Sequence, residues 1–354
     1  MNGSPLPALP AVYSFLFPEV GDVIRRFDAA FDPRLLRVGT PAASVTPWIR
    51  EHVSRSLVVP SVPGGRADLD ALHVPLIERV VELHAPLAPG LGDFGWRYPT
   101  SGSSEGIVHL LARLCASGAS GIRVIDGEYE GFGITAGHLG LGVESFPLAA
   151  LPDATPDARA VWCISQPSAR DGNLLPARVL DDLVDRGHRV VLDLAYLGST
   201  EPTAPLVDLR HPGIEAVVMS LSKPYGLFRW RIGWTFARDA VPSLYANRWF
   251  NDIGRQLLGL AVLEQVGPTS LARAWQPKQA GIVASLNADH GLRLRPADAV
   301  LIASMPVADG ADLDDAARKL LDPFRRAEAY RLCLTPALER ATVGELRGDD
   351  PVAA

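Results

Sequence analysis

Lysine is scarce in this sequence of 354 residues. Among its 34 lysines and arginines only Lys223, Lys278 and Lys319 are lysines, and the 40 aspartates and glutamates give a net charge of −6. Arginine replaces lysine on a solvated surface but forms no Schiff base, so the search for a nucleophilic amine narrows to three side chains. The mild negative charge argues against nucleic acid as the main partner, because phosphate binding requires a basic surface.

Cysteine and long apolar runs are also rare. Cys115, Cys163 and Cys333 lie far apart without a C-x-x-C pair, which favours a reducing compartment and no disulfide framework. No apolar stretch approaches the ~18 residues of a membrane span, and the first residues lack the basic segment of a signal peptide. We therefore expect a cytoplasmic protein with no membrane partner. The eight histidines show no H-E-x-x-H motif and no cluster with cysteine, so we also expect no metal site.

The composition excludes a disordered chain, because hydrophobic residues make up 47% and charged residues 21% of the sequence. From about Tyr98 onward, short apolar runs alternate with amphipathic segments, of which Glu105–Cys115 and Pro176–Gly187 have helical spacing. The apolar runs predict five strands, at Gly121–Ile125, Ala160–Ser165, Arg189–Asp193, Ala216–Ser222 and Ile232–Ala237.

The two ends of the chain differ from this middle part. The first ~90 residues are rich in proline and predict an irregular segment with short helical patches at Thr46–Arg55 and Leu72–Leu83. After about residue 245 the pattern predicts two helices, Ser243–Gln265 and Ser270–Leu286. The chain then predicts strand, helix, strand and helix, at Ala299–Met305, Asp312–Leu321, Arg331–Leu334 and Ala337–Leu346.

Alternating helices and strands that are apolar on both faces indicate an α/β fold with a mostly parallel central sheet. We expect a large domain over residues 61–245 and a smaller α+β domain over residues 246–354, to which an N-terminal segment, residues 1–60, contributes. Ligands of such sheets bind beyond the carboxyl ends of the strands. The candidate residues at those ends are Tyr129, Gln166, Asp193, Ser222 and Lys223.

The strongest motif is Ser220-Leu-Ser-Lys-Pro-Tyr-Gly226, followed by Arg231-Ile-Gly-Trp234. Lys223 comes directly after an apolar strand, where desolvation makes an amine nucleophilic. The hydroxyls of Ser220 and Ser222 and the guanidinium of Arg231 can converge on one phosphate. An isolated lysine at a strand end more often reaches solvent, but the S-x-S-K-(x)7-R-x-G spacing favours a functional role.

Two further motifs favour a phosphorylated heterocycle as the ligand. Asp193 ends a strand, and a carboxylate buried there requires a cation such as a protonated ring nitrogen, although a helix N-cap is an equal alternative. Thr100-Ser-Gly-Ser-Ser-Glu-Gly-Ile107 opens a helix, where N–H groups and hydroxyls form an anion site or a plain cap. The chain has no G-x-x-x-x-G-K-[ST] loop, which argues against a nucleoside triphosphate, and Ser145 replaces the third glycine of a G-x-G-x-x-G pattern, so we discard a dinucleotide fingerprint.

Together these motifs resemble the class I/II aminotransferases of the fold-type I superfamily, with a histidinol-phosphate aminotransferase-like pattern. The resemblance covers most of the chain and is clearest from Gly102 to Arg231 and again at Arg331. It implies an aminotransferase-like fold of type I, a pyridoxal 5′-phosphate (PLP) cofactor, an amino-acid substrate and a homodimer.

The resemblance also implies roles for individual residues. Lys223 forms the Schiff base with the cofactor, Asp193 pairs with the pyridine nitrogen and keeps it protonated, and Tyr196 bonds the 3′-oxygen. Tyr129 stacks on the pyridine ring. The implied phosphate ligands are Gly102, Ser103, Ser104, Ser220, Ser222 and Arg231. The implied substrate contacts are Arg331, which grips the α-carboxylate, and the pocket-lining Gly39 of Gly39-Thr-Pro41.

The chain departs from the family pattern in two places. The family has Asn-Pro-x-x-Pro-x-Gly after the next strand, whereas this chain has Ser165-Gln-Pro-Ser-Ala-Arg-Asp-Gly-Asn173, so either Gln166 or Asn173 takes the role of that asparagine toward the 3′-oxygen. The family also often supplies a tyrosine from the partner subunit, and none stands near Pro63-Gly-Gly-Arg-Ala-Asp-Leu69. Whether a partner subunit completes the phosphate site is therefore open.

Three functions fit these motifs. The first is a PLP-dependent transferase of the aminotransferase class, which acts at the α-carbon of an amino acid and serves small-molecule biosynthesis. The second keeps the cofactor but carries out β- or γ-elimination, replacement or cyclisation, with S-adenosylmethionine among the possible substrates. The third is a non-catalytic PLP-binding sensor. The cofactor supplies the chemistry that these reactions share, so the protein determines which bond at the α-carbon breaks.

Overall fold

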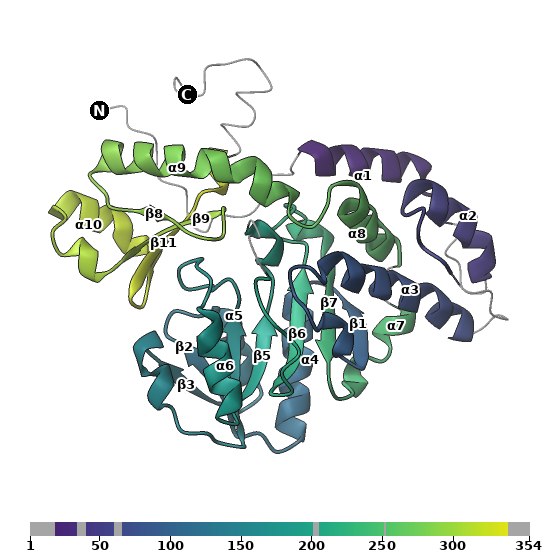
Figure 1. Cartoon of the computed structure of the whole chain (residues 1–354), viewed down its shortest axis with the longest axis horizontal. Coiled ribbons are helices and arrows are strands. Elements are labelled where there is room, and N and C mark those ends of the chain that lie inside the picture. Colours follow the sequence, from purple (N-terminus) through teal and green to yellow (C-terminus); the bar gives the residue numbers. More distant parts are fainter. Residues whose placement is uncertain (1–17, 34–39, 60–65, 201–204, 251–252, 339–354) are drawn as a thin grey trace, which may run out of the picture.

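The computed structural model describes residues 18–33, 40–59, 66–200, 205–250 and 253–338. They form a seven-stranded sheet with helices on both faces and a separate four-stranded sheet (Figure 1). None of the described helices combines the length and the apolarity that a membrane crossing requires.

The large sheet has the strand order β1-β7-β6-β5-β4-β2-β3. Strands β2 to β6 run parallel, and β7 is antiparallel to both of its neighbours, β1 and β6. The strands are β1 (Trp96–Thr100), β2 (Gly121–Ile125), β3 (Gly142–Phe146), β4 (Ala160–Ser165), β5 (Arg189–Asp193), β6 (Ile214–Ser220) and β7 (Gly233–Ala237). The mostly parallel central sheet that the sequence predicts is therefore confirmed.

Each face of the large sheet packs on its own set of helices. On one face, α4 (Ser103–Ala116) and α5 (Glu130–His138) cover the sheet, and the buried stripe of α4 at i, i+3, i+4 and i+7 is Ile107, Leu110, Leu111 and Leu114. The other face packs on α3 (Arg66–His84), α6 (Ala177–Asp185) and α8 (Ile253–Gln265). Both faces are buried, which is why β4 and β5 read as continuous apolar runs.

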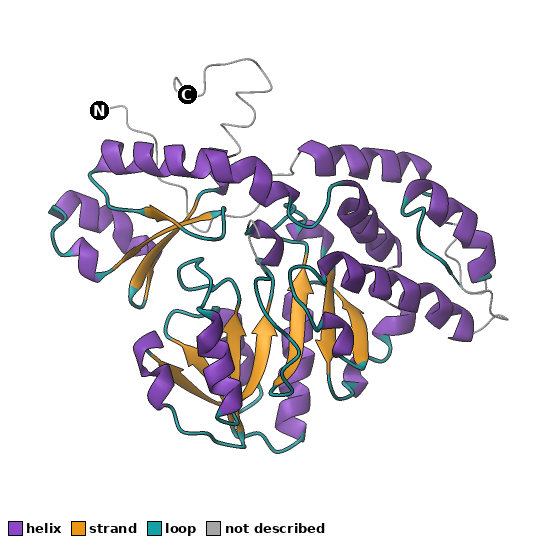
Figure 2. Cartoon of the chain, in the orientation of Figure 1, coloured by secondary structure: helices purple, strands orange, loops and turns teal. Residues whose placement is uncertain are grey.

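The four-stranded sheet has the order β10-β11-β9-β8 and is antiparallel throughout. Its strands are β8 (Arg295–Pro296), β9 (Ile302–Pro306), β10 (Arg325–Arg326) and β11 (Ala329–Cys333), accompanied by α9 (Ser270–His290) and α10 (Asp315–Leu321). This small sheet lies at the end of the large sheet toward which the parallel strands point (Figure 2). Backbone hydrogen bonds join Ala299 N to Gly172 O and Val300 N to Ser199 O, both 2.9 Å, across this junction.

The N-terminal part is more helical than the sequence predicts. It contains α1 (Pro18–Ala30), α2 (Ala42–His52) and the long α3, so the two predicted helical patches fall on helices, and the expectation that the rest of the segment is irregular is wrong. Proline lowers helix propensity because it removes a backbone donor and clashes with the preceding turn, yet Pro47 and Pro75 lie inside α2 and α3. Burial of one face of each helix against the core outweighs that local cost.

Two other expectations need correction. The predicted helix Ser243–Gln265 is broken into a 3-10 turn at Pro242–Leu244, the short α7 (Asn247–Phe250) and α8. Strands β1 and β3 were not expected, because each lies at an edge of the sheet, where one flank is unpaired and apolar periodicity is weak. The predicted final helix, Ala337–Leu346, lies mostly outside the described residues.

Candidate active site

The loops after the parallel strands bring three of the predicted residues together around Lys223. Its Nζ lies 3.8 Å from the centre of the Tyr196 ring and 5.9 Å from the centre of the Tyr129 ring. Tyr196 follows β5, Tyr129 precedes α5, and Lys223 follows β6, so three separate loops supply the group. Contact of a lysine amine with the face of an aromatic ring restrains the position of the amine.

Asp193 is the most buried acidic group of this cluster. It is the last residue of β5, 5% of its surface is exposed, and one carboxylate oxygen accepts a hydrogen bond from Ala195 N at 2.9 Å. Burial raises the pKa of Asp193 to about 6, and the nearby positive charge of Lys223 offsets part of that rise. A cationic ring nitrogen beside Asp193 would complete the compensation of this buried charge.

A second group of predicted residues forms a turn at the start of α4. Gly102 caps the helix with a φ of +82°, and a Cβ built on it would lie 2.6 Å from the terminal nitrogen of Arg231. That nitrogen donates to Ser101 O at 2.9 Å. Ser103 is buried and Ser104 is exposed at the first turn of the helix. The helix N-terminus and the guanidinium together make a place for an anion that only glycine leaves open.

The two serines before Lys223 differ in their hydrogen bonds. The Ser220 hydroxyl oxygen accepts a bond from Ser222 N at 3.0 Å, which shapes the turn that presents Lys223. The Ser222 hydroxyl is buried, and within the described part of the chain it has no hydrogen-bond partner. A buried hydroxyl without a partner is costly, so this oxygen indicates a polar ligand at the site.

Gln166 and Asn173, the two candidates for the 3′-oxygen contact, both bond to backbone groups. The Gln166 amide accepts from Leu175 N at 3.0 Å and donates to Leu175 O and Leu206 O, each at 3.3 Å. The Asn173 side-chain oxygen accepts from Asp298 N at 3.3 Å. Gln166 therefore fixes the loop that follows β4, and Asn173 ties that loop to the small sheet.

Arg331 lies on β11 of the small sheet, where it pairs with Ser304 of β9. Its guanidinium donates to Ala169 O in the loop after β4, so the small sheet reaches over the end of the large sheet. A cavity of about 630 Å³ adjoins this contact and is lined by the loop after β4 and by the small sheet with its loops, among others by Arg170, Asn173, Arg295, Ser304 and Arg325. Gly39, the other predicted substrate contact, lies outside the described residues.

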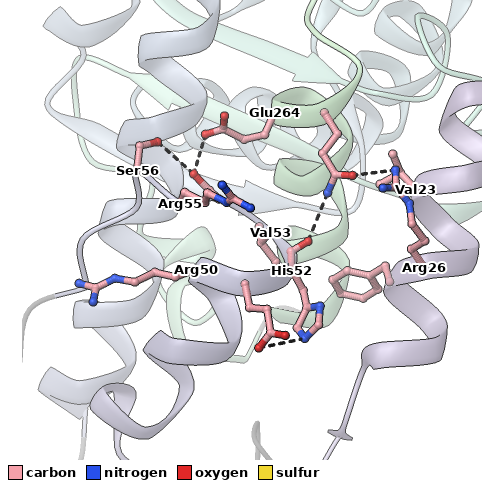
Figure 3. A pocket seen from close by; sticks show the side chains of 12 residues that line it. Val23, Arg26, Arg50, His52, Val53, Arg55, Ser56 and Glu264 are labelled. Atoms are coloured by element: carbon pink, nitrogen blue, oxygen red, sulfur yellow. Dashed lines mark hydrogen bonds and ion pairs between the residues drawn. The ribbon is translucent and has the colours of Figure 1, made fainter.

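A second cavity, of about 470 Å³, lies elsewhere, between α1, α2 and the end of α8 (Figure 3). Its polar groups bond to one another: Glu264 accepts from Ser54 at 2.7 Å, and Gln265 accepts from Arg26 at 2.9 Å and donates to His52 O at 3.3 Å. None of the predicted site residues lines it. We therefore interpret it as a gap in the packing between these helices.

The sequence did not indicate a role for Glu128, although its carboxylate contacts residues beside the Lys223 cluster. It follows Gly127 and precedes Tyr129, and its buried carboxylate accepts hydrogen bonds from Ser165 and Tyr129. The available signal was a glutamate next to the candidate stacking residue, in a turn directly after a strand. Among the described residues, no three histidine, cysteine, aspartate or glutamate side chains are grouped so that they could hold a metal ion.

The model of the family described as "Aminotransferase class I and II" matches residues 99–275, which is half of the chain. The chain belongs to the class I and II aminotransferase family. The matched segment includes the turn at Gly102, the loops at Tyr129 and Asp193, and the Lys223 motif. Members of this family use pyridoxal phosphate, which makes PLP the cofactor to test against the site.

Curated relatives in the family are distant. Histidinol-phosphate aminotransferase of Aeromonas salmonicida is 29% identical over 159 residues, which cover 41% of this chain and 44% of the relative. LL-diaminopimelate aminotransferase of Moorella thermoacetica is 27% identical over 241 residues, 59% of this chain and 60% of that protein. The chain therefore matches less than half the length of the first of these relatives.

Solved structures show the fold over nearly the whole chain. A variant of Thermus thermophilus aspartate aminotransferase aligns with a TM-score of 0.62 at 14% identity, over 98% of this chain and 96% of that one. The PLP-bound C-S lyase of Staphylococcus hominis aligns with a TM-score of 0.59 at 11% identity, over 88% of each chain. At such identities the likeness concerns the fold, which is that of the fold-type I aminotransferases.

The residues at the site fit the cofactor of the family. The unpartnered Ser222 hydroxyl and the Gly102 turn against Arg231 offer a place for a phosphate. A buried carboxylate at Asp193 suits a protonated pyridine nitrogen, and Lys223 is an amine within the same cluster. Side chains of suitable chemistry are therefore present for the phosphate, the ring nitrogen and the aldehyde of the cofactor.

Proposed function

We propose that the chain is a PLP-dependent enzyme that acts at the α-carbon of an amino acid, and that it is an aminotransferase. One observation carries this proposal: Lys223, Tyr196 and Asp193 come from two adjacent strand ends and meet in one buried cluster. When bound, the cofactor supplies an electron sink that weakens the bonds at the α-carbon. The side chains of the protein supply the binding, the orientation and the proton transfer.

The cofactor-binding roles follow from charge and hydrogen-bonding capacity. Lys223 attaches to the cofactor aldehyde through its amine, Asp193 holds the proton on the ring nitrogen, and Tyr196 donates to the 3′-oxygen. Tyr129 lies against the ring face. The proposed phosphate ligands are the α4 N-terminus with Gly102, Ser103 and Ser104, together with Ser220, Ser222 and Arg231.

The substrate roles fall at the junction of the two sheets. Arg331 binds the α-carboxylate in place of Ala169 O, since a guanidinium forms two parallel hydrogen bonds with a carboxylate. The Lys223 amine would remove and return the proton at the α-carbon as general base and acid. The cavity between loop 170–173 and the small sheet receives the rest of the substrate.

The assembly and the domain limits belong to the same proposal. We take the enzyme to be a cytoplasmic homodimer, with a large domain over residues 61–245 and a small domain built from residues 1–60 and 246–354. Gln166 is the better candidate for a 3′-oxygen contact, because it follows β4 directly and lies beside Asp193 across the strand pair. It would have to exchange one of its backbone partners for the cofactor.

A second candidate keeps the cofactor and changes the reaction to elimination, replacement or cyclisation. The departure of loop 165–173 from the family pattern favours it, because this loop faces the substrate cavity. The C-S lyase among the similar folds has that type of activity by its name. A non-catalytic sensor is the third candidate, and the presence of Lys223, Asp193 and Arg331 together argues against it.

The deciding experiment uses purified protein and borohydride. Apoprotein incubated with PLP should turn yellow, and reduction followed by peptide mapping should place the pyridoxyl group on Lys223. The Lys278→Ala and Lys319→Ala variants are matched controls and should label as the wild type does, whereas Lys223→Ala should not label. A colourless wild-type protein after incubation with PLP would refute the proposal.

Amino acids then distinguish the three candidates. A transaminase converts bound PLP to pyridoxamine phosphate when an amino acid is added without a keto acid. An elimination enzyme instead returns the original spectrum and releases a keto acid with ammonia. A sensor binds an amino acid and changes the spectrum without turnover.

A further inference from the structure

Glu128 is a buried side chain that collects hydrogen bonds from three parts of the chain. It lies in the loop after β2, and 8% of its surface is exposed. Oε1 accepts from Tyr129 N at 2.9 Å and from the Ser165 hydroxyl at 2.6 Å, and Oε2 accepts from Ser165 N at 3.0 Å. The backbone of Ala169 donates to the same carboxylate.

Each of these donors belongs to a segment that carries a residue of the proposed site. Tyr129 provides the ring that lies 5.9 Å from the Lys223 amine. Ser165 ends β4 directly beside Asp193 of β5. The carbonyl of Ala169 accepts from the Arg331 guanidinium. Glu128 therefore connects three parts of the proposed site. They are Tyr129, which stacks on the cofactor ring, Asp193, which faces the ring nitrogen, and Arg331, which binds the substrate carboxylate.

The chemistry of the four contacts requires a carboxylate. All four partners are N–H or O–H donors, so the side chain acts only as an acceptor. A glutamine has one acceptor oxygen, and its amide nitrogen would face donors. An isosteric amide therefore fills the same volume but breaks part of the network, which makes it an informative replacement.

We propose that Glu128 is a positioning residue of the cofactor site, which holds the Tyr129 ring in the place that PLP requires and fixes the loop at Ala169 beside Arg331. It contacts neither the cofactor nor the substrate. The inference rests on the proposed function, because the site that Glu128 positions is the PLP site.

The negative charge of Glu128 also acts on Asp193. The charged groups that influence Asp193 are Lys223, beyond the end of β6, and Glu128, in the loop after β2. Glu128 adds to the rise in the pKa of Asp193 that burial causes, whereas Lys223 opposes it. Removing the Glu128 charge should therefore lower the pH at which Asp193 loses its proton, an effect that packing alone would not produce.

The test compares Glu128→Gln with Glu130→Gln. Glu130 is two residues away, its side chain is 57% exposed, and it faces Arg326 at 3.5 Å, so the same chemical change there leaves the network intact. PLP affinity is measured by absorbance titration of the apoprotein, and the setting of the ring by circular dichroism of the cofactor band. Glu128→Gln should bind PLP about tenfold more weakly, with a smaller dichroic band, since buried hydrogen bonds to a charged group are lost. Glu130→Gln should match the wild type.

A milder variant keeps the test possible if Glu128→Gln does not fold. Ser165→Ala removes only the 2.6 Å hydroxyl contact and leaves the three backbone donors, so it should weaken PLP binding about threefold in the same direction. If Glu128→Gln does not fold, this variant decides by the same two measurements. In Glu128→Gln the acid limb of the PLP affinity profile should move to lower pH, while Glu130→Gln leaves it in place.

The inference and the proposed function fail in different ways. If the wild type binds PLP and both Glu128→Gln and Ser165→Ala bind it with wild-type affinity, dichroism and pH dependence, the positioning role is refuted and the proposed function stands. If the wild type binds no PLP, the proposed function fails first and the positioning role falls with it.

Discussion

At the scale of single residues, Asp193 makes the stability of the apoprotein depend on pH. Its pKa is about 6 in the folded chain against an ordinary aspartate value of 3.8, so between pH 4 and 6 the folded protein keeps a proton that the unfolded chain releases. The free energy of unfolding therefore falls as the pH rises through this window, and the full shift corresponds to about 3 kcal/mol.

This dependence is measured by urea unfolding of the apoprotein from pH 4 to pH 8. The wild type should lose stability relative to Asp193→Asn as the pH rises to about 7, because the amide fills the same space without ionising. Above that pH the difference should stay constant. Parallel profiles for the two proteins at every pH would show that burial of Asp193 does not govern its ionisation.

The sequence could place some residues of the site but not their hydrogen bonds. Asp193 and Lys223 each follow an apolar run, and parallel strands end at one edge of the sheet, so their proximity was predictable. Gln166 lies equally close to that edge, yet its amide turns toward Leu175 and Leu206. Side-chain direction within an irregular loop depends on contacts from distant segments, which no local pattern encodes. Glu128 was missed for the same reason.

At the scale of helices and strands, Gly106 sets how closely α4 packs on the large sheet. A Cβ at this position would lie 2.2 Å from the Thr235 hydroxyl oxygen and 2.8 Å from Val218 Cγ1. Gly106→Ala should therefore push α4 away from β6 and β7 and lower the free energy of unfolding by about 1–3 kcal/mol. The phosphate turn at Gly102 begins the same helix, so PLP affinity should fall as well.

Gly133 in α5 is the matched control for that prediction. A Cβ there meets no atom within 4 Å, so Gly133→Ala adds a methyl group to a helix without a collision. It should stabilise the protein by about 0.5–1 kcal/mol, the usual difference between the two residues in a helix. Both values come from denaturant unfolding. If the two variants shift stability in the same direction, close packing of α4 is not the determining factor.

Elements with strong periodicity were predictable to the residue, and edge elements were not. Strands β4 and β5 have the predicted bounds because both of their faces are buried and each reads as an apolar run. Strand β2 also has the predicted bounds, although Arg123 interrupts its apolar residues. Strand β3 is an edge strand whose residues are mostly exposed, so its sequence carries no apolar signal. Helices α2 and α3 contain Pro47 and Pro75, and the sequence predicted only part of each, because packing against the core extends them beyond their locally helical patches.

At the scale of the whole molecule, the loop after β4 connects the large sheet to the small sheet through hydrogen bonds. Gly172 O accepts from Ala299 N, Asp298 accepts from Leu174 N at 2.8 Å, and Ala169 O accepts from Arg331. Gly172 has a φ of +80°, and a Cβ on it would lie 2.8 Å from Ile302 Cβ of the small sheet. A side chain at position 172 would therefore push the loop after β4 away from the small sheet.

Gly172→Ala should therefore destabilise the protein by more than backbone strain alone. Gly118 has a similar φ of +89° but no atom within 4 Å of a Cβ, so Gly118→Ala measures the strain by itself, about 1 kcal/mol. The collision with Ile302 should add about 1–3 kcal/mol to the loss in Gly172→Ala, as in other overpacked interiors. Urea unfolding of both apoproteins gives this difference. Equal losses in the two variants would mean that the small sheet moves aside without cost, and that the domain junction is not a close-packed surface.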